Sequence, residues 1–356
     1  MIFGNKKRSN NFGIDIGTKS IKIVEVSQKK DGIVLENYAK LDLDFACRDF
    51  FRSFDKNSLN PDIDNISTAL RILIAEAEIK KKTATFSLPD FAPFYSSFEM
   101  PPMSKKEIDG AIGFEARKYI PLPLSEVVLD WQLVEKEKVD KDAKIEVLVM
   151  AVPKIVVGQY KQIAEKAGIV LDSLEAEAMA LKRSLLFKEK DNNVCLVEMG
   201  YQSTNVSVIN NGFMKMSFSF DVAGKDLTNI IVERFNVNSH EAEKAKRKYG
   251  IMESDGLLLR DVLEPKLLEI TTKIRKIIKE VDGRDGIATE RIILSGGTSL
   301  MPGLLDYFRN SFDDISVEIG KPFKKIIYSR SLEEKMEEIN ANYAIALGGA
   351  LRSFEQ

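Results

Sequence analysis

The feature that most constrains this chain is a short pattern that occurs twice: apolar strand, acidic residue, one residue, glycine, hydroxyl-rich turn, apolar strand. The first copy is FGIDIGTKSIKIVEV at residues 12–26, and the second is VCLVEMGYQSTN at residues 194–205. The two acids, Asp15 and Glu198, occupy equivalent positions in the two copies. Either copy alone is compatible with an ordinary β-hairpin that turns on a glycine. Two copies in one chain instead predict an internal repeat, with two related α/β halves.

The residue types in the first copy suit a phosphate group. Gly17 allows a sharp turn in which backbone N–H groups face a ligand, and Thr18 and Ser20 add hydroxyl donors. Lys22 adds a cation, while the carboxylate of Asp15 suits the magnesium that accompanies a nucleotide. The turn is not a Walker loop, because the chain has no GxxxxGK[ST] and the turn leads into a strand.

A third glycine turn is expected in IILSGGTSLMPGL at residues 292–304. The double glycine Gly296–Gly297, at the end of an apolar strand, allows close approach to a flat ring or a ribose. The helix that is expected to follow favours an anionic group at its N-terminus. A second double glycine, Gly348–Gly349 in the closing helix, predicts tight packing against another backbone instead of a ligand site.

Composition excludes several other classes of protein. The 356 residues include 52 basic and 54 acidic side chains, so the overall charge gives no case for binding nucleic acid. No apolar run approaches the roughly 18 residues of a membrane span, and no signal peptide is apparent. A single histidine and two distant cysteines, Cys47 and Cys195, make zinc, disulfide and histidine-based catalytic readings poor. We therefore expect a cytoplasmic protein.

The length favours two domains or one bilobed α/β unit. We expect Pro265 to open a long helix and the segment after Pro153 to form another, closed by Gly168. In the region 89–149, prolines and a capping box at Ser104 predict a small inserted α/β subdomain. The predicted boundaries are 1–88 for the first lobe, 89–149 for the insert, 150–192 for the first lobe continued, 193–223 for the second lobe, 224–289 for its helical subdomain, 290–341 for the third glycine turn, and 342–356 for a closing helix.

The three glycine turns, in this order, resemble the phosphate-1, phosphate-2 and adenosine motifs of the actin-like ATPase superfamily. The resemblance implies a bilobed actin-like fold, built from duplicated RNase H-like halves, that binds ATP and Mg²⁺ between them. The implied nucleotide-binding residues are Asp15, Gly17, Thr18, Lys19, Ser20, Lys22, Gly200, Gln202, Ser203, Thr204, Glu243, Lys246, Gly296, Gly297 and Thr298. Asp15 and Glu198 are the implied metal ligands and the candidate catalytic carboxylates. For Glu243 and Lys246, a plain ion pair on a helix face remains the alternative.

Within the superfamily the chain resembles PilM, the cytoplasmic actin-like family of type IV pilus assembly, which is related to FtsA. The stretches MIFGNKKR, EARKYIPLPL…VLDWQ and ALGGALR carry this resemblance. It implies a scaffold at the inner face of the inner membrane that binds the cytoplasmic N-terminal tail of PilN, with further pilus platform proteins and the pilus motor as additional candidates. Membrane contact is then indirect, and because the sequence stops at Gln356 we expect no terminal membrane helix of the FtsA type.

Two other functions stay open on the residues alone: a small-molecule kinase on the same fold, and a polymerising cytoskeletal protein like FtsA or MreB. We expect at most slow ATP hydrolysis, because Glu198 replaces the usual aspartate and only Gln159 offers a polar group of the right type on the helix after Pro153. We also expect the insert to supply partner-binding surface. The apolar residues proposed for this surface are Met100, Met103, Tyr119, Leu122 and Leu124.

Overall fold

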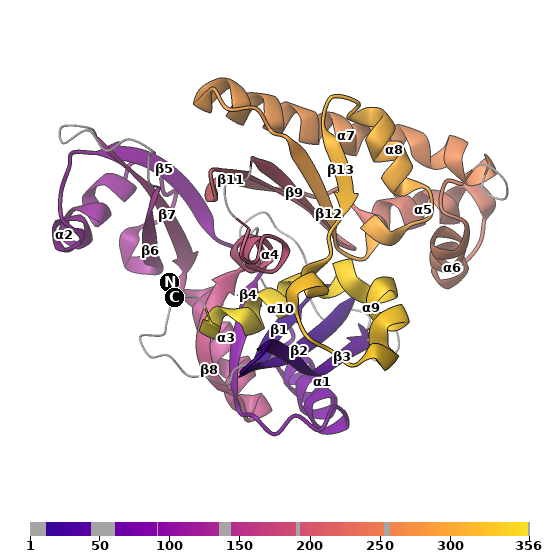
Figure 1. Cartoon of the computed structure of the whole chain (residues 1–356), viewed down its shortest axis with the longest axis horizontal. Helices are drawn as coiled ribbons and strands as arrows, with labels where there is room; N and C mark the ends of the chain where they lie inside the picture. The colour runs from indigo at the N-terminus through magenta and orange to yellow at the C-terminus, as the bar shows by residue number, and fades with distance from the viewer. Residues whose placement is uncertain are drawn as a thin grey trace. The chain divides into compact units, whose positions relative to one another are not determined.

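A computed structural model describes residues 12–43, 61–90, 92–134, 144–189, 193–252 and 257–354. The chain forms two compact units (Figure 1). Unit 1 comprises the residues up to Ala180 together with those from Ile345 onward, and unit 2 comprises Leu181–Ala344. Cys47 and the basic residues at the start of the chain lie outside the described residues.

Unit 1 is built on a five-stranded sheet in the order β3-β2-β1-β4-β8. Its strands are β1 (Phe12–Ile16), β2 (Ser20–Lys29), β3 (Gly32–Asp42), β4 (Thr83–Leu88) and β8 (Val170–Ala176). The first three strands form antiparallel hairpins, whereas β1, β4 and β8 run parallel. Parallel strands end at the same edge of a sheet, so the ends of β1, β4 and β8 place polar side chains together.

Helices α1 (Ile63–Glu76) and α3 (Lys154–Ala167) pack on this sheet and on each other. Helix α1 begins at Asp62, whose carboxylate accepts a hydrogen bond from the backbone N–H of Asn65. Helix α3 ends at Gly168 in the left-handed conformation, with φ of 73°, as the sequence predicts. The apolar stripes of both helices form a common core with β1 and β4.

The closing helix α10 (Ala344–Leu351) approaches two other backbones closely. A Cβ atom on Gly348 would lie 1.9 Å from the carbonyl oxygen of Ala180, in helix α4 (Glu177–Leu185). A Cβ atom on Gly13 would lie 1.9 Å from the carbonyl oxygen of Ala346. The prediction of tight packing at the Gly348–Gly349 pair is therefore confirmed, and only glycine fits at both approaches.

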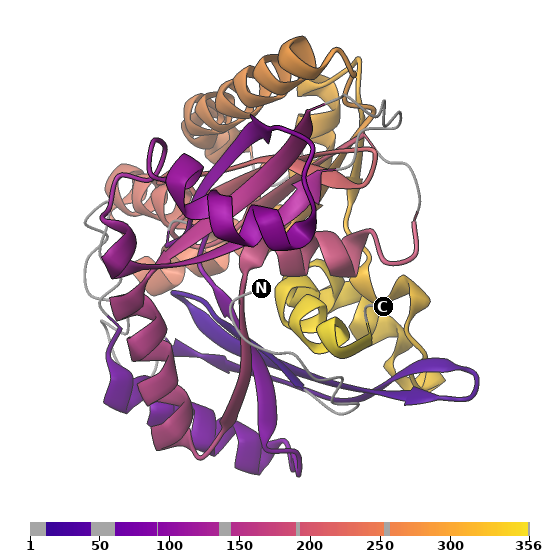
Figure 2. The same ribbon diagram turned by 90° about the vertical axis from the view of Figure 1, so that its left-hand side faces the viewer.

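Between β4 and α3 the chain forms a three-stranded antiparallel sheet in the order β5-β7-β6, covered by one helix (Figure 2). The elements are β5 (Phe94–Met100), α2 (Lys105–Ala116), β6 (Val127–Val134) and β7 (Ile145–Pro153). The predicted capping box forms, because Ser104 and Glu107 exchange hydrogen bonds at the start of α2. Ile108, Ile112 and Ala116 of α2 are buried against the sheet.

Unit 2 contains a second five-stranded sheet, in the order β11-β10-β9-β12-β13. Its strands are β9 (Val194–Met199), β10 (Thr204–Asn210), β11 (Phe213–Phe220), β12 (Arg291–Ser295) and β13 (Ser316–Ile319). Strands β9, β10 and β11 form antiparallel hairpins, and β9, β12 and β13 run parallel. This is the order and direction of the unit 1 strands, so the predicted duplication is present in the fold.

Unit 2 is otherwise helical. Its helices are α5 (Gly224–Phe235), α6 (Ser239–Tyr249), α7 (Leu257–Asp285), α8 (Leu304–Ser311) and α9 (Glu333–Ile339). The sequence predicted that Pro265 opens α7. That prediction is wrong, because Pro265 lies inside this helix. The helix begins earlier, at Leu257, and Leu263 and Leu267 on either side of the proline are fully buried, so packing outweighs the lost backbone hydrogen bond. The predicted subdomain boundaries stay predictions.

Candidate functional site

The β1–β2 turn in unit 1 is narrow and is held by its own backbone. The N–H of Gly17 donates to the carbonyl oxygen of Ser20 at 3.0 Å. A Cβ atom on Gly17 would lie 3.1 Å from that same oxygen, so a side chain there would crowd the turn. Thr18 and Lys19 are half-buried at its tip, and the side chain of Ser20 is buried.

Directly behind this turn lies a buried ion pair. The β1–β2 register places Asp15 opposite Lys22, and the Lys22 ammonium donates to Asp15 Oδ2 at 2.9 Å. The side chains are 11% and 4% exposed for Lys22 and Asp15, so both charges are largely removed from water. Removing one member of such a pair costs about 3–5 kcal/mol, because the other charge is left buried and unpaired. Lys22 therefore stabilises the Asp15 carboxylate in the folded chain.

The β9–β10 turn in unit 2 repeats this geometry. The N–H of Gly200 donates to the carbonyl oxygen of Ser203 at 3.0 Å, and Glu198 lies opposite Asn205. Asn205 Nδ2 donates to Glu198 Oε2 at 3.2 Å. The Glu198 carboxylate thus accepts a hydrogen bond from a neutral amide, whereas the Asp15 carboxylate pairs with a cation. Each carboxylate is held by the residue facing it across its hairpin.

Around the second turn, unit 2 brings two further segments together. The carbonyl oxygen of Gly200 accepts hydrogen bonds from Thr298 Oγ1 at 2.7 Å and from the N–H of Gly224 at 3.2 Å. A Cβ atom on Gly224 would lie 2.4 Å from Thr298 Oγ1. Only glycine at the start of α5 therefore allows the predicted phosphate-2 and adenosine motifs to meet.

Lys246 on α6 also contacts the start of α5. Its ammonium donates to the carbonyl oxygen of Gly224 and to Thr228 Oγ1, both at 2.8 Å, and pairs with Glu243 at 2.8 Å. An ammonium group has three donors, and these three contacts engage them. Glu243 and Lys246 therefore form the ion pair on one helix face that the sequence left open as an alternative. Lys246 also fixes α6 to α5. A role of Glu243 and Lys246 in binding nucleotide stays a prediction.

The two adjacent glycines of the third turn are not equivalent. Gly296 has φ of 85°, and a Cβ atom there would lie 2.5 Å from both Glu198 Oε1 and the Met199 carbonyl oxygen. Gly297 has φ of −66°, is exposed, and would place its Cβ no closer than 3.5 Å to its nearest neighbour, in Asn342. Gly296 is required by the fold, whereas Gly297 is a position where a side chain can be added without disturbing the backbone.

The remaining predicted residues divide by exposure. Gln202 and Ser203 are half-buried at the tip of the second turn. The side chain of Thr204 is fully buried, and its hydroxyl donates to the carbonyl oxygen of Val222 at 2.6 Å. Of the proposed nucleotide-binding residues in unit 2, the structure gathers Gly200, Glu243, Lys246 and Thr298 around Gly224, while Gly296 lies against Glu198 and Met199. Gly224 was not singled out from the sequence.

Sequence reasoning also missed a polar cluster at the ends of the parallel strands in unit 1. Tyr160 of α3 is fully buried, and its pKa is raised well above its ordinary value by burial and by the charges of Glu177 and Asp15. The Tyr160 hydroxyl has no hydrogen-bond partner among the described residues. Glu177 follows β8, a strand that the sequence analysis did not anticipate, and so its acid was overlooked.

A second buried acid in this region is Asp90, which follows β4. Its carboxylate accepts hydrogen bonds from the N–H of Ala178 at 3.0 Å and from the Tyr95 hydroxyl at 3.4 Å. Burial raises the pKa of Asp90 from 3.8 to about 7. Burial, followed by the charge of Asp90, raises the pKa of Tyr95 well above its ordinary value.

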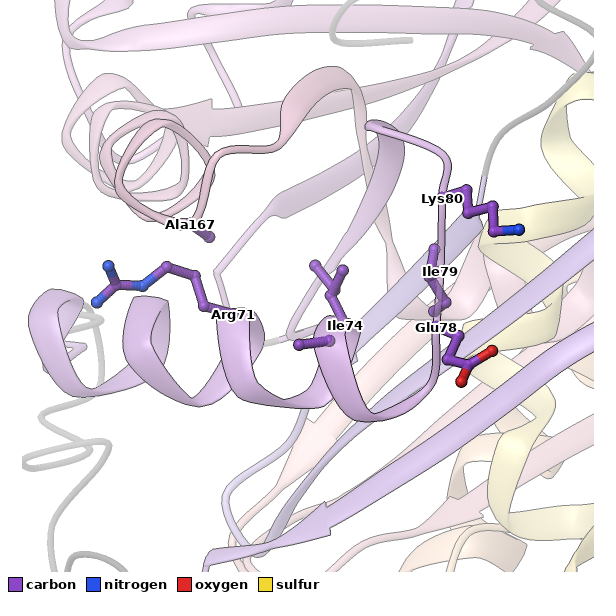
Figure 3. Close-up of a pocket in the computed structure, with 7 residues that line it drawn as sticks. Arg71, Ile74, Glu78, Ile79, Lys80 and Ala167 are labelled. Carbon is purple, nitrogen blue, oxygen red and sulfur yellow. The ribbon is translucent and has the colours of Figure 1, made fainter.

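A cavity of about 370 Å³ opens elsewhere in unit 1, between the C-terminal ends of α1 and α3 (Figure 3). Apolar Ile74 lies at its centre, with the cations Arg71 and Lys80 at either end. None of the proposed nucleotide-binding residues lines it.

No helix in the part of the chain that the structure describes is long and apolar enough to cross a membrane. Among the same residues, no three acidic, histidine or cysteine side chains gather in a preformed metal cluster.

Comparison with known proteins identifies a matching family and several similar proteins. Residues 13–354 match the family model described as "Type IV pilus assembly protein PilM". The fold superposes on a chain of a "PilM-PilN type IV pilus biogenesis complex" with a TM-score of 0.85 and 25% identity, covering 99% of this chain and 100% of that one. Among curated relatives, the cell division protein FtsA of Buchnera aphidicola is 27% identical over 215 residues, or 51% of this chain. The chain spans about half the length of the curated relatives it matches, 50% for this one.

A more distant structure shares the fold alone. MreB5 of Spiroplasma citri, solved bound to ADP, matches with a TM-score of 0.54 and 14% identity, covering 96% of this chain and 95% of that one. These matches confirm the predicted actin-like α/β fold.

Proposed function

Because the chain belongs to the PilM family of type IV pilus assembly proteins, we propose that it is an ATP-binding scaffold of the pilus assembly platform that holds the cytoplasmic N-terminal tail of PilN. The observation that carries this proposal is the end-to-end similarity to a chain of the PilM–PilN complex. In this proposal the scaffold works at the inner face of the inner membrane through PilN.

The nucleotide part of the proposal rests on the duplicated turns. Each turn presents backbone and hydroxyl donors beside a carboxylate, which suits phosphate and magnesium. In unit 1, Asp15 Oδ2 is engaged by Lys22, while Oδ1 lies 4.0 Å from the position a Cβ on Gly17 would take, on the side of the turn. Asp15 in unit 1 and Glu198 in unit 2 are each proposed as a Mg²⁺ ligand beside the turn of its own unit, and the metal would neutralise phosphate charge.

Unit 2 would contribute the ribose and adenine side. Gly297 is exposed beside the Gly200–Gly224–Thr298 cluster, and its missing side chain leaves room for a flat ring. Lys246 and Glu243 would act chiefly by fixing α6 against Gly224, and Thr204 by fixing the end of β10. Hydrolysis would be slow, since Glu198 replaces the shorter aspartate. Glu177, whose charge acts on Tyr160 together with that of Asp15, is a better candidate than Gln159 for positioning water.

The partner part of the proposal assigns PilN to the inserted subdomain. We expected Met100 to line this binding surface. It is instead 2% exposed and belongs to the core of the subdomain, so it does not line the surface. Tyr119 is 51% exposed and stacks on Phe98, with ring centroids 5.0 Å apart. Leu122 is half-buried between the exposed Pro121 and Pro123, and Leu124, directly after Pro123, is half-buried as well. This ridge, Tyr119 to Leu124, offers apolar side chains on a rigid backbone to a peptide.

The test is binding of a synthetic peptide with the sequence of the PilN cytoplasmic tail, measured by fluorescence anisotropy. Tyr119→Ala should weaken binding by about tenfold or more, the size expected for an aromatic hot spot. Ile155→Ala is the matched control, because Ile155 is 71% exposed on α3, outside the insert. No binding by the wild-type chain would overturn the proposed partner, and equal loss in both variants would overturn the assignment to the insert.

A further inference from the structure

The outer face of α2 carries an unusual stripe. At about 100° per residue, four side-chain positions fall in a sector roughly 80° wide, directly opposite the buried face of the helix. From the N-terminal end of the helix these positions are Glu107, Gly110, Phe114 and Arg117, which is the helix C-cap in αR conformation. In Figure 2 this helix faces the viewer, in front of the three-stranded sheet.

Two features of this stripe have no explanation inside the chain. Phe114 is 74% exposed, the highest value among the exposed large apolar side chains that the structure describes. A Cβ atom on Gly110 would meet nothing within 4 Å, and Gly110 has no positive φ. Glycine in a helix interior costs about 1 kcal/mol relative to alanine. An exposed aromatic knob thus lies one turn from a hole that no contact within the chain requires.

The stripe is complementary to itself. In an antiparallel pair of identical helices related by a two-fold axis, if residue i faces residue j then j faces i. The register that places Phe114 of one copy over Gly110 of the other also places Glu107 opposite Arg117 of the other copy. Knob and hole, and anion and cation, are then matched twice in one interface.

We propose that α2 is a self-association surface, through which two copies of this chain pair by this stripe. Arg117 already lies over its own Phe114 ring, 5.7 Å from the centroid, so it would cover the edge of the buried aromatic. Nearby Lys118 is neutralised within its own chain by Glu115 at 2.7 Å, which limits repulsion between the copies. One helix pair is a small interface, so the dimer is weak in dilute solution and favoured where the protein is concentrated.

The surface uses other residues than the proposed PilN ridge, and the proposal does not depend on nucleotide. Sedimentation velocity of the full chain over a range of concentrations measures the monomer–dimer equilibrium. We expect a concentration-dependent dimer, weakened about tenfold or more by Phe114→Ala, which removes the knob twice. Gly110→Gln fills the hole with a good helix former, so it should reduce dimerisation while the melting temperature stays equal or rises.

A charge exchange identifies the register. Glu107→Arg and Arg117→Glu should each weaken the homodimer, because each places like charges opposite one another. An equimolar mixture of these two variants should dimerise again, since both pairs are then restored in the heterodimer. Both variants are checked for unchanged folding by circular dichroism, because Glu107 also belongs to the capping box.

A chain that remains monomeric at concentrations of several hundred micromolar would overturn the proposal. A dimer that is insensitive to Phe114→Ala and Gly110→Gln would also overturn it, because the contact would lie on another surface. Failure of the mixture to recover would refute the antiparallel register.

Discussion

Asp90 provides a test of whether the buried polar cluster of unit 1 excludes water as completely as its geometry indicates. Asp90 is 7% exposed, and burial raises the pKa of its carboxyl group from 3.8 to about 7. The folded chain therefore holds a proton that the unfolded chain releases between these values. Stability from this group is present below the unfolded pKa and is lost as the pH rises through about 7.

The magnitude follows from the two pKa values. A difference of about 3 units corresponds to about 4 kcal/mol, at 1.36 kcal/mol per unit, which is the largest effect that one proton can have here. Asp90→Asn keeps an oxygen that can accept from the N–H of Ala178 but cannot ionise. The variant should match the wild type near pH 4 and be more stable by up to about 4 kcal/mol near pH 8. The acids Glu175 and Glu177, whose charges act on the neighbouring Tyr95, remain in both proteins.

The assay is urea unfolding from pH 4 to pH 8, followed by the fluorescence of Trp131, the single tryptophan of the chain, which lies in unit 1 with Asp90. The matched control is Asp31→Asn, because Asp31 is exposed to solvent in the β2–β3 turn. Parallel curves for wild type and Asp90→Asn would refute the reasoning, since Asp90 would then ionise equally in the folded and unfolded chains.

Three further predictions concern packing, reactivity and turnover. Gly348→Ala should lower the melting temperature sharply or prevent folding, because its Cβ would lie 1.9 Å from the Ala180 carbonyl oxygen, whereas Gly158→Ala on α3 meets nothing within 4 Å and should be neutral or stabilising. Burial raises the pKa of the Cys195 thiol, so in a Cys47→Ser background native protein should not react with a thiol reagent, and reaction should appear only on unfolding. ATP turnover, followed by phosphate release, should fall below the range of about 1–100 per second typical of kinases, and a rate within that range would contradict the assigned slow hydrolysis.

Much of the architecture could be predicted from local signals. Alternation of apolar residues around the glycine turns defined both hairpins, and the capping box at Ser104 and the C-cap at Gly168 were confirmed because each depends on neighbouring residues alone. Strands β5, β8 and β13 were missed: β13 has only four residues, β8 mixes acidic with apolar residues, and β5 lies between prolines. The position of Pro265 was wrong because burial along the whole of α7 decided where that helix begins.

The candidate site was predictable in its parts and not in its connections. Spacing identified Asp15 and Lys22 but could not reveal that they pair, since that depends on the hairpin register. The role of Gly224 depends on contacts among segments far apart in the sequence. Glu177 was overlooked because the strand order, which the sequence does not reveal, brings both Glu177 and Asp15 within electrostatic reach of Tyr160.

Binding of ATP with Mg²⁺, measured by isothermal titration calorimetry, tests the nucleotide claim most directly. Gly297 is the position to alter, because its backbone angles suit any residue and its surroundings are open. The account predicts that wild type and Gly297→Ala bind ATP, and that Gly297→Arg loses binding by about a hundredfold or more while melting at the same temperature, since the long side chain would fill the space assigned to the ring. Equal ATP affinity in wild type and a well-folded Gly297→Arg variant, or no binding by wild type, would contradict it.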